Sequence, residues 1–172
     1  INISIPGDPS SAAFFAALTI LNKSSMLKIK NVGLNPTRLG FYDLLKNHGA
    51  NIKFISKRKK NNELKGDIII RSGKLLKPIF APTSFYEKTT DEFPILFCIA
   101  ALTKGTSIFK GIEDLANKES NRIKEMQKIL KQIGIKSIFK KNEMKIFGKR
   151  LLKNKIIKVP NLKDHRICMS SA

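Results

Sequence analysis

Two long apolar runs stand out along the chain. Residues 12–21 and 94–102 are apolar at nearly every position, so neither run offers a polar side to water. A helix with this pattern is buried on all sides in a folded protein. Each run closely follows an aspartate, Asp8 or Asp91, and Asp8 is followed by Pro9, a pairing typical of a helix N-cap. The pattern therefore predicts buried helices that each begin at an aspartate.

A second kind of segment is apolar on one side only. Residues 119–134 carry an apolar stripe at helical spacing and end at a glycine, and residues 39–49 repeat this pattern. Short β-like runs separate the helices, and a tight turn at 140–143 predicts a hairpin. The expected strands are 2–5, 27–32, 51–56, 67–71, 79–81, 106–112, 136–139, 144–147 and 156–159.

The order of these elements repeats along the chain. Asp8, Asp91 and Asp164 each stand before an apolar run, and each run opens a similar succession of elements. The repeated unit is βαβαββ, with apolar helices inside and sheets outside. We therefore expect an α/β fold of the inside-out barrel kind, as one partial domain over 1–172 that belongs to a longer protein. The expected units are 1–78, 79–155 and the start of a third, cut in mid-helix, at 156–172.

The composition changes this picture little. The 172 residues are 42% hydrophobic, which excludes general disorder, and 33 Lys+Arg against 13 Asp+Glu give a net charge of +20. Most of the basic residues are lysines, whereas proteins that recognise nucleic-acid bases favour arginine. Lysine together with abundant Ile and Asn is what an A/T-rich coding sequence produces by drift. We therefore expect the densest basic run, 57–60, to be a solvated loop. A cleft lined with positive charge would nevertheless concentrate small anions.

Several classes of protein are disfavoured by the sequence. The apolar runs are about half the ~20 residues that a membrane span needs. No secretory signal pattern opens the chain. Cys98 and Cys168 lie in apolar runs, as reduced core thiols of a cytoplasmic protein would. We expect no metal site, since there are two histidines and no Cys-x-x-Cys motif.

Three clusters hold charge that a hydrophobic core does not need: 91–92, 117–122 and 164–166. Lys118 and Arg122 are four residues apart, so we expect them to share one helix face. Each cluster also has an ordinary explanation. Glu119 and Arg122 are spaced as an intrahelical ion pair, and the aspartates are spaced as helix caps. The start of a helix is equally a site where anions bind.

Taken together and in order, these motifs resemble the 5-enolpyruvylshikimate-3-phosphate (EPSP) synthase family. The most specific are Lys-Glu-Ser-Asn-Arg at 118–122 and Asp-His-Arg at 164–166; segments 6–15, 35–38 and 91–94 add to them. The resemblance covers essentially the whole chain, which is similar to the C-terminal part of the family. It implies two similar domains, each of three βαβαββ units, with the active site in the cleft between them.

The resemblance also implies an activity. The family transfers the carboxyvinyl group of phosphoenolpyruvate to the 5-hydroxyl of shikimate 3-phosphate and releases phosphate, a step in the biosynthesis of chorismate and aromatic amino acids. It uses no metal or organic cofactor. By resemblance, Arg122 and Arg166 grip phosphoenolpyruvate, for which a guanidinium fork is suited, and Lys118 places a point charge at the reacting centre.

The remaining implied roles concern protons and hydroxyl groups. Asp91 binds the shikimate ring hydroxyls and draws the proton from the attacking oxygen. Glu119 delivers and later removes the proton at the methylene carbon, and His165 supports the same cluster. Asp114 falls where family members carry an asparagine or an acid that touches the substrate. Ala116 and Asn117 depart from the family pattern without altering the motif that follows them.

Two other functions stay open at this stage. The sister transferase that acts on UDP-N-acetylglucosamine shares the fold, but it uses a catalytic cysteine in a mobile loop. A non-catalytic basic module that binds RNA would use the lysine surface instead. Of these three functions, we expect the shikimate-pathway transferase, with small-molecule substrates, no nucleic acid or membrane partner, and a monomer at full length. We expect this chain alone to be inactive.

Overall fold

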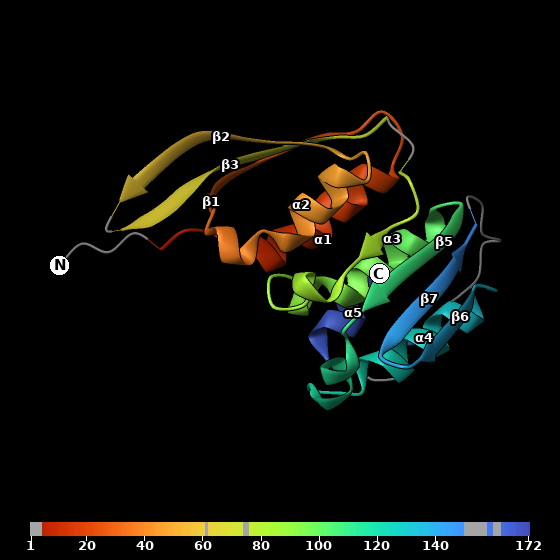
Figure 1. Cartoon of the computed structure of the whole chain (residues 1–172). Coiled ribbons are helices and arrows are strands. Elements are labelled where there is room, and N and C mark those ends of the chain that lie inside the picture. The colour runs from red at the N-terminus through yellow and green to blue at the C-terminus, as the bar shows by residue number, and fades with distance from the viewer. Residues whose placement is uncertain (1–4, 61, 74–75, 150–157, 160–162) are drawn as a thin grey trace.

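Within the residues that it describes, the computed structural model has two sheets, each backed by its own helices (Figure 1). The structure describes residues 5–60, 62–73, 76–149, 158–159 and 163–172. The first sheet has the order β1-β3-β2, with β1 (Met26–Gly33), β2 (Asn51–Lys60) and β3 (Glu63–Arg71). The second has the order β4-β5-β7-β6, with β4 (Phe80–Ala81), β5 (Gly105–Lys110), β6 (Lys136–Lys140) and β7 (Glu143–Gly148).

The helices alternate with these strands in the repeating order expected from the sequence. The α-helices are α1 (Pro9–Leu21), α2 (Gly40–Asn47), α3 (Phe93–Leu102), α4 (Arg122–Gln132) and α5 (His165–Ser171). Short 3-10 turns also occur: η1 (Pro36–Arg38), η2 (Thr83–Phe85), η3 (Thr90–Glu92) and η4 (Glu113–Asn117). The α/β arrangement with helices between two outer sheets is confirmed.

The two sheets repeat one pairing pattern. In the second sheet β4 runs parallel to β5, and the hairpin of β6 and β7 lies antiparallel beside β5. In the first, Gly7 forms a parallel bridge to Val32 of β1, and β2 and β3 are the antiparallel pair. The expected strand 2–5 lies outside the described residues except for Ile5, and so does half of the expected strand 156–159. The described pairing supports a repeated unit.

The prediction of a loop at residues 57–60 was wrong. β2 continues to Lys60, because Arg58 and Lys59 pair with Lys65 and Leu64 across the hairpin. The side chains of residues 57–59 are nevertheless exposed, as expected. A strand whose outer face meets water accepts charged side chains, so the basic run gave no signal against β structure.

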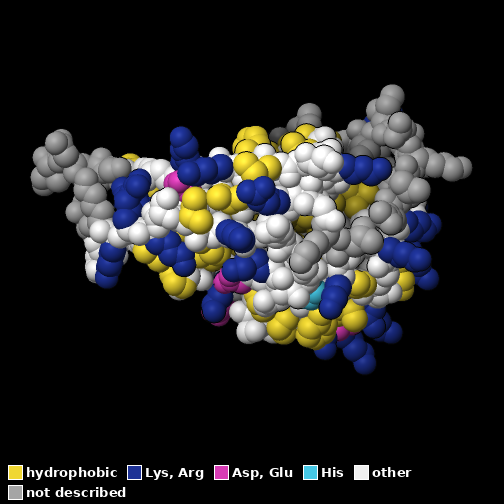
Figure 2. All heavy atoms as spheres, turned by 90° about the horizontal axis from the view of Figure 1, so that it is seen from above, with side chains coloured by type: hydrophobic (Ala, Val, Ile, Leu, Met, Phe, Trp, Pro, Cys, Tyr) yellow, Lys and Arg dark blue, Asp and Glu magenta, His cyan; other side chains and the backbone are white. Residues whose placement is uncertain are grey.

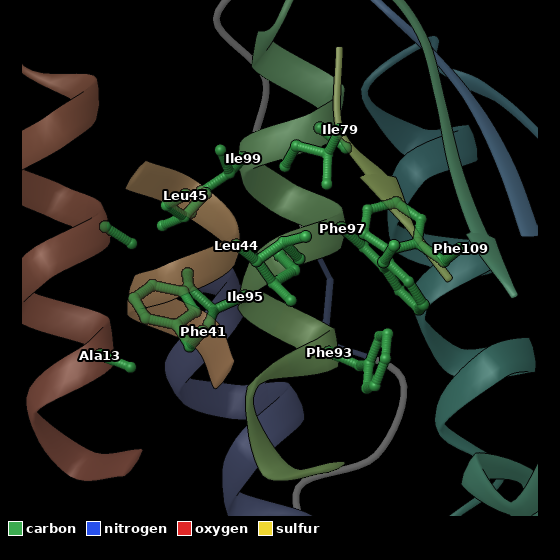
Figure 3. Close-up of a cluster of buried hydrophobic side chains, with 14 of the residues drawn as sticks. Ala13, Phe41, Leu44, Leu45, Ile79, Phe93, Ile95, Phe97, Ile99 and Phe109 are labelled. Atoms are coloured by element: carbon green, nitrogen blue, oxygen red, sulfur yellow. The ribbon is translucent and has the colours of Figure 1, made fainter. Parts of the chain in front are cut away.

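The apolar core is centred on α3. Every residue of this helix is buried except Cys98 and Leu102, which are partly buried, so the expectation of burial on all sides is confirmed. Figure 3 shows Ile95 and Ile99 on the side of α3 that faces α2, and Phe97 on the side that faces Phe109 of β5. The Phe97 and Phe109 rings meet edge to face with 5.0 Å between centroids. One continuous core therefore joins both sheets.

The same expectation was wrong for α1. Its alanines, such as Ala13 and Ala17, are fully buried, but Phe15 and Leu18 are 60% and 61% exposed. α1 packs against β1, β3 and α3, which lie on only part of its circumference. Among the residues that the structure describes, nothing covers the side that carries Phe15 and Leu18. This side is the exposed apolar face of α1.

β7 and α3 approach each other closely at one glycine. A Cβ on Gly148 would lie 2.0 Å from the Thr103 carbonyl oxygen and 2.1 Å from that of Ala100. Real Cβ atoms are never found this close to a backbone oxygen, so only glycine fits without a shift of the strand. Gly148 thereby allows the second sheet to lie directly on the central helix.

The thiols behave as core groups. No disulfide joins Cys98 and Cys168. Cys98 on α3 donates a hydrogen bond to the Ser170 carbonyl on α5 at 3.1 Å, and burial raises the pKa of the Cys98 thiol to about 12. Within the described part of the chain, no helix is both long and apolar enough to cross a bilayer.

Candidate active site

Arg122 is the centre of a charged cluster. Its side chain is only 1% exposed, yet it meets carboxylates from three separate segments. Its Nη2 lies 2.6 Å from Glu119 Oε2, its Nε 3.0 Å from Asp164 Oδ2, and its Nη1 3.5 Å from Asp91 Oδ1. Three charged motifs of the sequence therefore converge on one guanidinium.

The start of α4 presents Arg122 to the cluster. Asn121 caps this helix by accepting a hydrogen bond from the Lys124 backbone N–H, so the helix begins at Arg122. The expectation of a helix from residue 119 was therefore wrong, and Lys118 and Arg122 do not share a helix face. Residues 118–120 instead cross from η4 to α4. Glu119 still pairs with Arg122, but from outside the helix.

Asp164 has two roles that the sequence suggested separately. Its Oδ1 caps α5 through the backbone N–H groups of Arg166 and Ile167, as expected. Its Oδ2 accepts from Arg122 Nε and from the Ser120 hydroxyl at 2.8 Å. Burial opposes the charge on Asp164, but these donors outweigh it and lower the pKa of the carboxyl. Asp164 thus holds the buried Arg122 side chain in place.

Asp91 is not the helix cap that its position predicted. It lies in η3, and α3 begins two residues later with Glu92 at the N-cap position and no side-chain capping bond. Asp91 instead accepts a hydrogen bond from Arg166 Nη2 at 3.1 Å and lies against Arg122. Asp8, in contrast, caps α1 through the backbone N–H groups of Ser10 and Ser11.

Lys118 is held in a neighbouring pair. Its Nζ lies 2.8 Å from Asp114 Oδ2, and the same oxygen accepts from the Tyr86 hydroxyl at 2.6 Å. The bond from Lys118, with that from Tyr86, lowers the pKa of Asp114; burial and the Asp114 charge raise the pKa of Tyr86. In the structure, Asp114 therefore forms an ion pair with Lys118. Nothing in the sequence pattern pointed to Tyr86.

Arg166 and His165 open α5 beside the cluster. The Arg166 guanidinium lies over the Phe14 ring of α1, 5.9 Å from its centroid, and the residue is 9% exposed. His165 is exposed, and no polar contact of its ring is found among the described residues. The structure therefore joins Asp91, Glu119, Arg122 and Arg166 directly, with His165 adjacent only in sequence to Arg166.

Two buried donors of the cluster lack acceptors. Arg166 Nε has no hydrogen-bond partner among the described residues, and neither has Arg122 Nη1, whose distance of 3.5 Å from Asp91 Oδ1 makes an ion pair but no hydrogen bond. A buried guanidinium N–H without an acceptor is costly, and carboxylate or phosphate oxygens are its best partners. The cluster can therefore take up an anion, and the carboxylates beside it can carry protons.

Other features do not compete with this cluster. Shallow hollows of about 460 and 400 Å³ lie over α4–β6 and along the β6–β7 hairpin, with several lysines in their linings. Their described linings include no residue of the cluster. In the described ranges, no three His, Cys, Asp or Glu side chains come together as a metal site. The cluster around Arg122 is the candidate site because it combines buried guanidinium donors with carboxylates.

Comparison with known proteins finds one family that matches the whole chain. The family model for EPSP synthase (3-phosphoshikimate 1-carboxyvinyltransferase) matches residues 1–172. The chain is 38% identical to the 3-phosphoshikimate 1-carboxyvinyltransferase of Clostridium tetani and 41% identical to that of Persephonella marina. It aligns over 98% of its own length with each, but over only 38% and 39% of theirs.

Solved structures agree with the sequence comparison. An EPSP synthase from Acinetobacter baumannii superposes with a TM-score of 0.90 at 35% identity, covering 98% of this chain and 39% of that one. The enolpyruvyl transferase NikO from Streptomyces tendae superposes with a TM-score of 0.59 at 12% identity, again over 98% of this chain and 37% of that one. The second match shows the fold alone.

Proposed function

We propose that this chain, which belongs to the EPSP synthase family, forms the phosphoenolpyruvate-binding side of a carboxyvinyl transferase site. The reaction moves the carboxyvinyl group of phosphoenolpyruvate to the 5-hydroxyl of shikimate 3-phosphate and releases phosphate. It proceeds by addition, through a tetrahedral intermediate, and then elimination. The residues described above are suited to hold the anions and move the protons of such a reaction.

One observation carries the proposal: Arg122 and Arg166 are buried side by side on Asp91, and each retains an N–H group without an acceptor. Both substrates are polyanions, and a planar guanidinium fork binds carboxylate or phosphate through two parallel hydrogen bonds. An anion bound here would satisfy both orphan donors. Lys118, beside Asp114, would add a point charge near the reacting carbon.

The acidic residues are placed for proton transfer. Glu119 is half exposed and touches Arg122 at 2.6 Å, so an anion that binds Arg122 would release the Glu119 carboxyl toward the substrate. Glu119 would then deliver a proton to the methylene carbon and remove one in the elimination step. Asp91 would accept the proton of the attacking hydroxyl. Asp164 stays buried and holds Arg122 throughout.

The rest of the site would come from outside this chain. The chain spans about 38% of the length of the curated relatives it matches, so we propose that the shikimate phosphate is held by the remainder of the full-length protein. We propose units at 1–78, 79–155 and 156–172 within this part. We further propose a cytoplasmic monomer, since no disulfide joins Cys98 and Cys168 and one cleft needs one chain.

The rival functions find less support. The sister transferase needs a reactive cysteine in a mobile loop, whereas Cys98 and Cys168 lie on α3 and α5 and burial raises the pKa of Cys98. An RNA-binding module would gather its cations. Figure 2 shows the Lys and Arg side chains scattered over the visible face, with hydrophobic and other side chains between them.

Phosphate release tests the proposal. The protein, produced at the length of its curated relatives, should release phosphate only when phosphoenolpyruvate and shikimate 3-phosphate are both present. UDP-N-acetylglucosamine should not replace shikimate 3-phosphate. A gel shift with RNA over a salt series serves as the comparison, because RNA binding weakens steeply as salt rises. No phosphate release, together with a salt-dependent RNA shift, would contradict the proposal.

A further inference from the structure

Tyr86 lies between η2 and η3 and has no part in the function proposed above. Its hydroxyl donates a hydrogen bond of 2.6 Å to Asp114 Oδ2 in η4, although the two residues are 28 positions apart in sequence. The same oxygen lies 2.8 Å from Lys118 Nζ. One carboxylate oxygen is therefore shared between a tyrosine and the lysine that would stand near the reacting carbon.

The Tyr86 ring is fixed on the apolar core. It stacks on the Phe93 ring, with 5.7 Å between the centroids and 27° between the planes. Phe93 is fully buried at the start of α3 and lies against the rings of Phe97 and Phe109 (Figure 3). A tyrosine side chain has only two torsion angles, so a ring that is held by stacking also fixes the position of its hydroxyl oxygen.

The backbone of Tyr86 reaches the turn that carries Asp91. The Tyr86 carbonyl oxygen accepts from the Thr90 hydroxyl at 2.8 Å and from the Thr89 N–H at 3.1 Å. Thr90 comes directly before Asp91 in η3, and Asp91 pairs with both arginines of the cluster. Tyr86 therefore contacts the Asp91 turn through its backbone and the pair of Asp114 and Lys118 through its side chain.

The pair of Asp114 and Lys118 benefits from a fixed partner because it is open to solvent. The exposed fraction of the side chain is 52% for Asp114 and 30% for Lys118. An ion pair between exposed side chains is weak, since holding two mobile side chains in one geometry costs entropy. A hydrogen bond to a charged acceptor is stronger than a neutral one, so the Tyr86 hydroxyl can hold the carboxylate in place. Burial and the Asp114 charge raise the pKa of Tyr86, so this hydroxyl stays a donor at neutral pH.

We propose that Tyr86 is a positioning residue: through Asp114, it sets where the Lys118 ammonium stands. The proposal rests on the function proposed above, because Lys118 has to reach the reacting centre. In this role Tyr86 meets no substrate and carries no proton. Its loss should therefore slow the chemical step and leave phosphoenolpyruvate binding, which we assign to Arg122 and Arg166, largely intact.

Tyr86→Phe in the protein at the length of its curated relatives tests this. Phenylalanine keeps the ring on Phe93 and removes only the hydroxyl. We expect kcat to fall about fivefold or more and KM for phosphoenolpyruvate to stay within about twofold of wild type. Tyr42→Phe, at the other tyrosine of this chain, is the matched control, because the buried Tyr42 hydroxyl donates to the Pro9 carbonyl at 2.8 Å. It should lower the unfolding temperature and leave kcat within about twofold of wild type.

The same substitution in an Asp114→Ala background tests the route. Without the Asp114 carboxylate, the Tyr86 hydroxyl has lost its acceptor, so Tyr86→Phe should change kcat by less than about twofold. A residue that only stabilised the fold would lower kcat by the same factor in both backgrounds. An equally large loss in the Asp114→Ala background would therefore overturn the positioning role.

Each outcome decides one claim. If the wild type releases no phosphate, the proposed function fails and the positioning role with it. If the wild type is active and Tyr86→Phe matches it, only the positioning role is overturned. An equal loss of kcat in Tyr42→Phe would also overturn it, because any lost tyrosine hydroxyl would then have this effect. Should Tyr86→Phe not fold, Asp114→Ala decides: a lower kcat at an unchanged KM for phosphoenolpyruvate supports the role, and a wild-type kcat refutes it.

Discussion

At the scale of single residues, Arg122 depends on its partners. Its guanidinium is buried, and the fully buried Asp164 is the one partner that water cannot replace. Breaking a buried pair by removing one member leaves an uncompensated charge, which costs about 3–5 kcal/mol. The exposed members, Glu119 and Asp91, can exchange with solvent or substrate at a much smaller cost.

Asp164→Asn should therefore destabilise the protein by about 3 kcal/mol near neutral pH, because Arg122 loses its buried counter-charge. The lowered pKa of Asp164 also sets a pH dependence. Its contribution to the free energy of unfolding is complete above about pH 4, the ordinary carboxyl pKa, and is lost as the pH falls through the lowered value. Denaturant unfolding from pH 7 to pH 2 measures this.

The control for that series is Asp43→Asn. Asp43 is exposed on α2, and its substitution changes the net charge equally without touching the cluster. The stability difference between Asp164→Asn and wild type should narrow toward low pH, whereas the difference for Asp43→Asn should stay small throughout. A gap for Asp164→Asn that does not narrow in acid would contradict the buried pair.

Two kinetic variants separate proton transfer from binding. Glu119→Gln should lower kcat about 100-fold or more while substrate affinity survives, because it removes a proton carrier but keeps the shape. Arg122→Lys keeps the charge but loses the fork, and should chiefly raise KM for phosphoenolpyruvate. Steady-state kinetics and calorimetry distinguish the two. Equally small effects from both would mean that Glu119 and Arg122 form only a structural ion pair.

The sequence could predict the residues that stand in distinctive motifs. Six residues were expected to share one site: Asp91, Lys118, Glu119, Arg122, His165 and Arg166. The structure joins four of them through Arg122 and Asp91, whereas Lys118 pairs with Asp114 and the His165 ring has no polar contact among the described residues. Tyr86 could not be assigned a place from the sequence, since its contact with Asp114 depends on how the segment around η2 packs against a distant turn. A motif identifies chemistry by residue type, whereas a positioning contact is specified only by the fold.

At the scale of elements, periodicity located the helices and strands but not always their ends. The amphipathic stripe predicted α4, and Gly134, which has a φ of 75°, follows its end as expected. Its start moved from Glu119 to Arg122, because Asn121 competes as a cap. This shift has a chemical result: it frees Lys118 and Glu119 from the helix, so they can reach different partners.

Gly148 provides a test of the contact between β7 and α3. Gly148→Ala should destabilise the protein by about 2 kcal/mol or more, because the methyl group would collide with two backbone oxygens that cannot rotate away. Gly33→Ala is the matched control. Gly33 is also a strand residue, and its nearest contacts to a Cβ are ordinary, at 3.6 Å. Thermal unfolding should show little change for Gly33→Ala.

Equal effects of the two substitutions would contradict this prediction. If Gly33→Ala destabilised as much as Gly148→Ala, the loss would reflect the general cost of altering a strand glycine. The close approach of β7 to α3 would then not be needed for stability.

At the scale of the whole molecule, the two sheets in the described part of the chain repeat one pairing pattern and share one apolar core. Figure 1 shows both sheets outside and the helices between them. Internal repetition predicted this arrangement, because the same succession of patterns occurred twice. The exposed side of α1 could not be predicted in this way. An apolar run indicates that a helix can be buried, but it does not indicate which neighbours cover each side.

The chain alone should be inactive. It carries the residues proposed to bind phosphoenolpyruvate and move protons, but it spans only about 38% of its relatives' length. Its cations also face water, where a pair of unit charges 4 Å apart attracts by only about 1 kcal/mol. Closure by a second domain would exclude that water.

Phosphate release by this 172-residue chain, measured beside the protein at full length, checks the prediction. Activity should return when the remaining part is supplied as a separate chain. Turnover by the 172-residue chain within tenfold of the full-length rate would contradict the division of the site between two domains.

The apolar face of α1, with Phe15 and Leu18, also bears on how copies of this chain behave together in solution. The net charge of +20 makes neighbouring molecules repel one another, and this repulsion reaches as far as the Debye length. Added salt shortens that reach, from about 30 Å at 0.01 M to about 8 Å at 0.15 M, while the attraction between apolar faces persists. Preparations of the chain alone should thus disperse best in dilute buffer and become turbid as salt is added. The colloidal stability of this chain is therefore a property of its charge, and it can be lost without any unfolding.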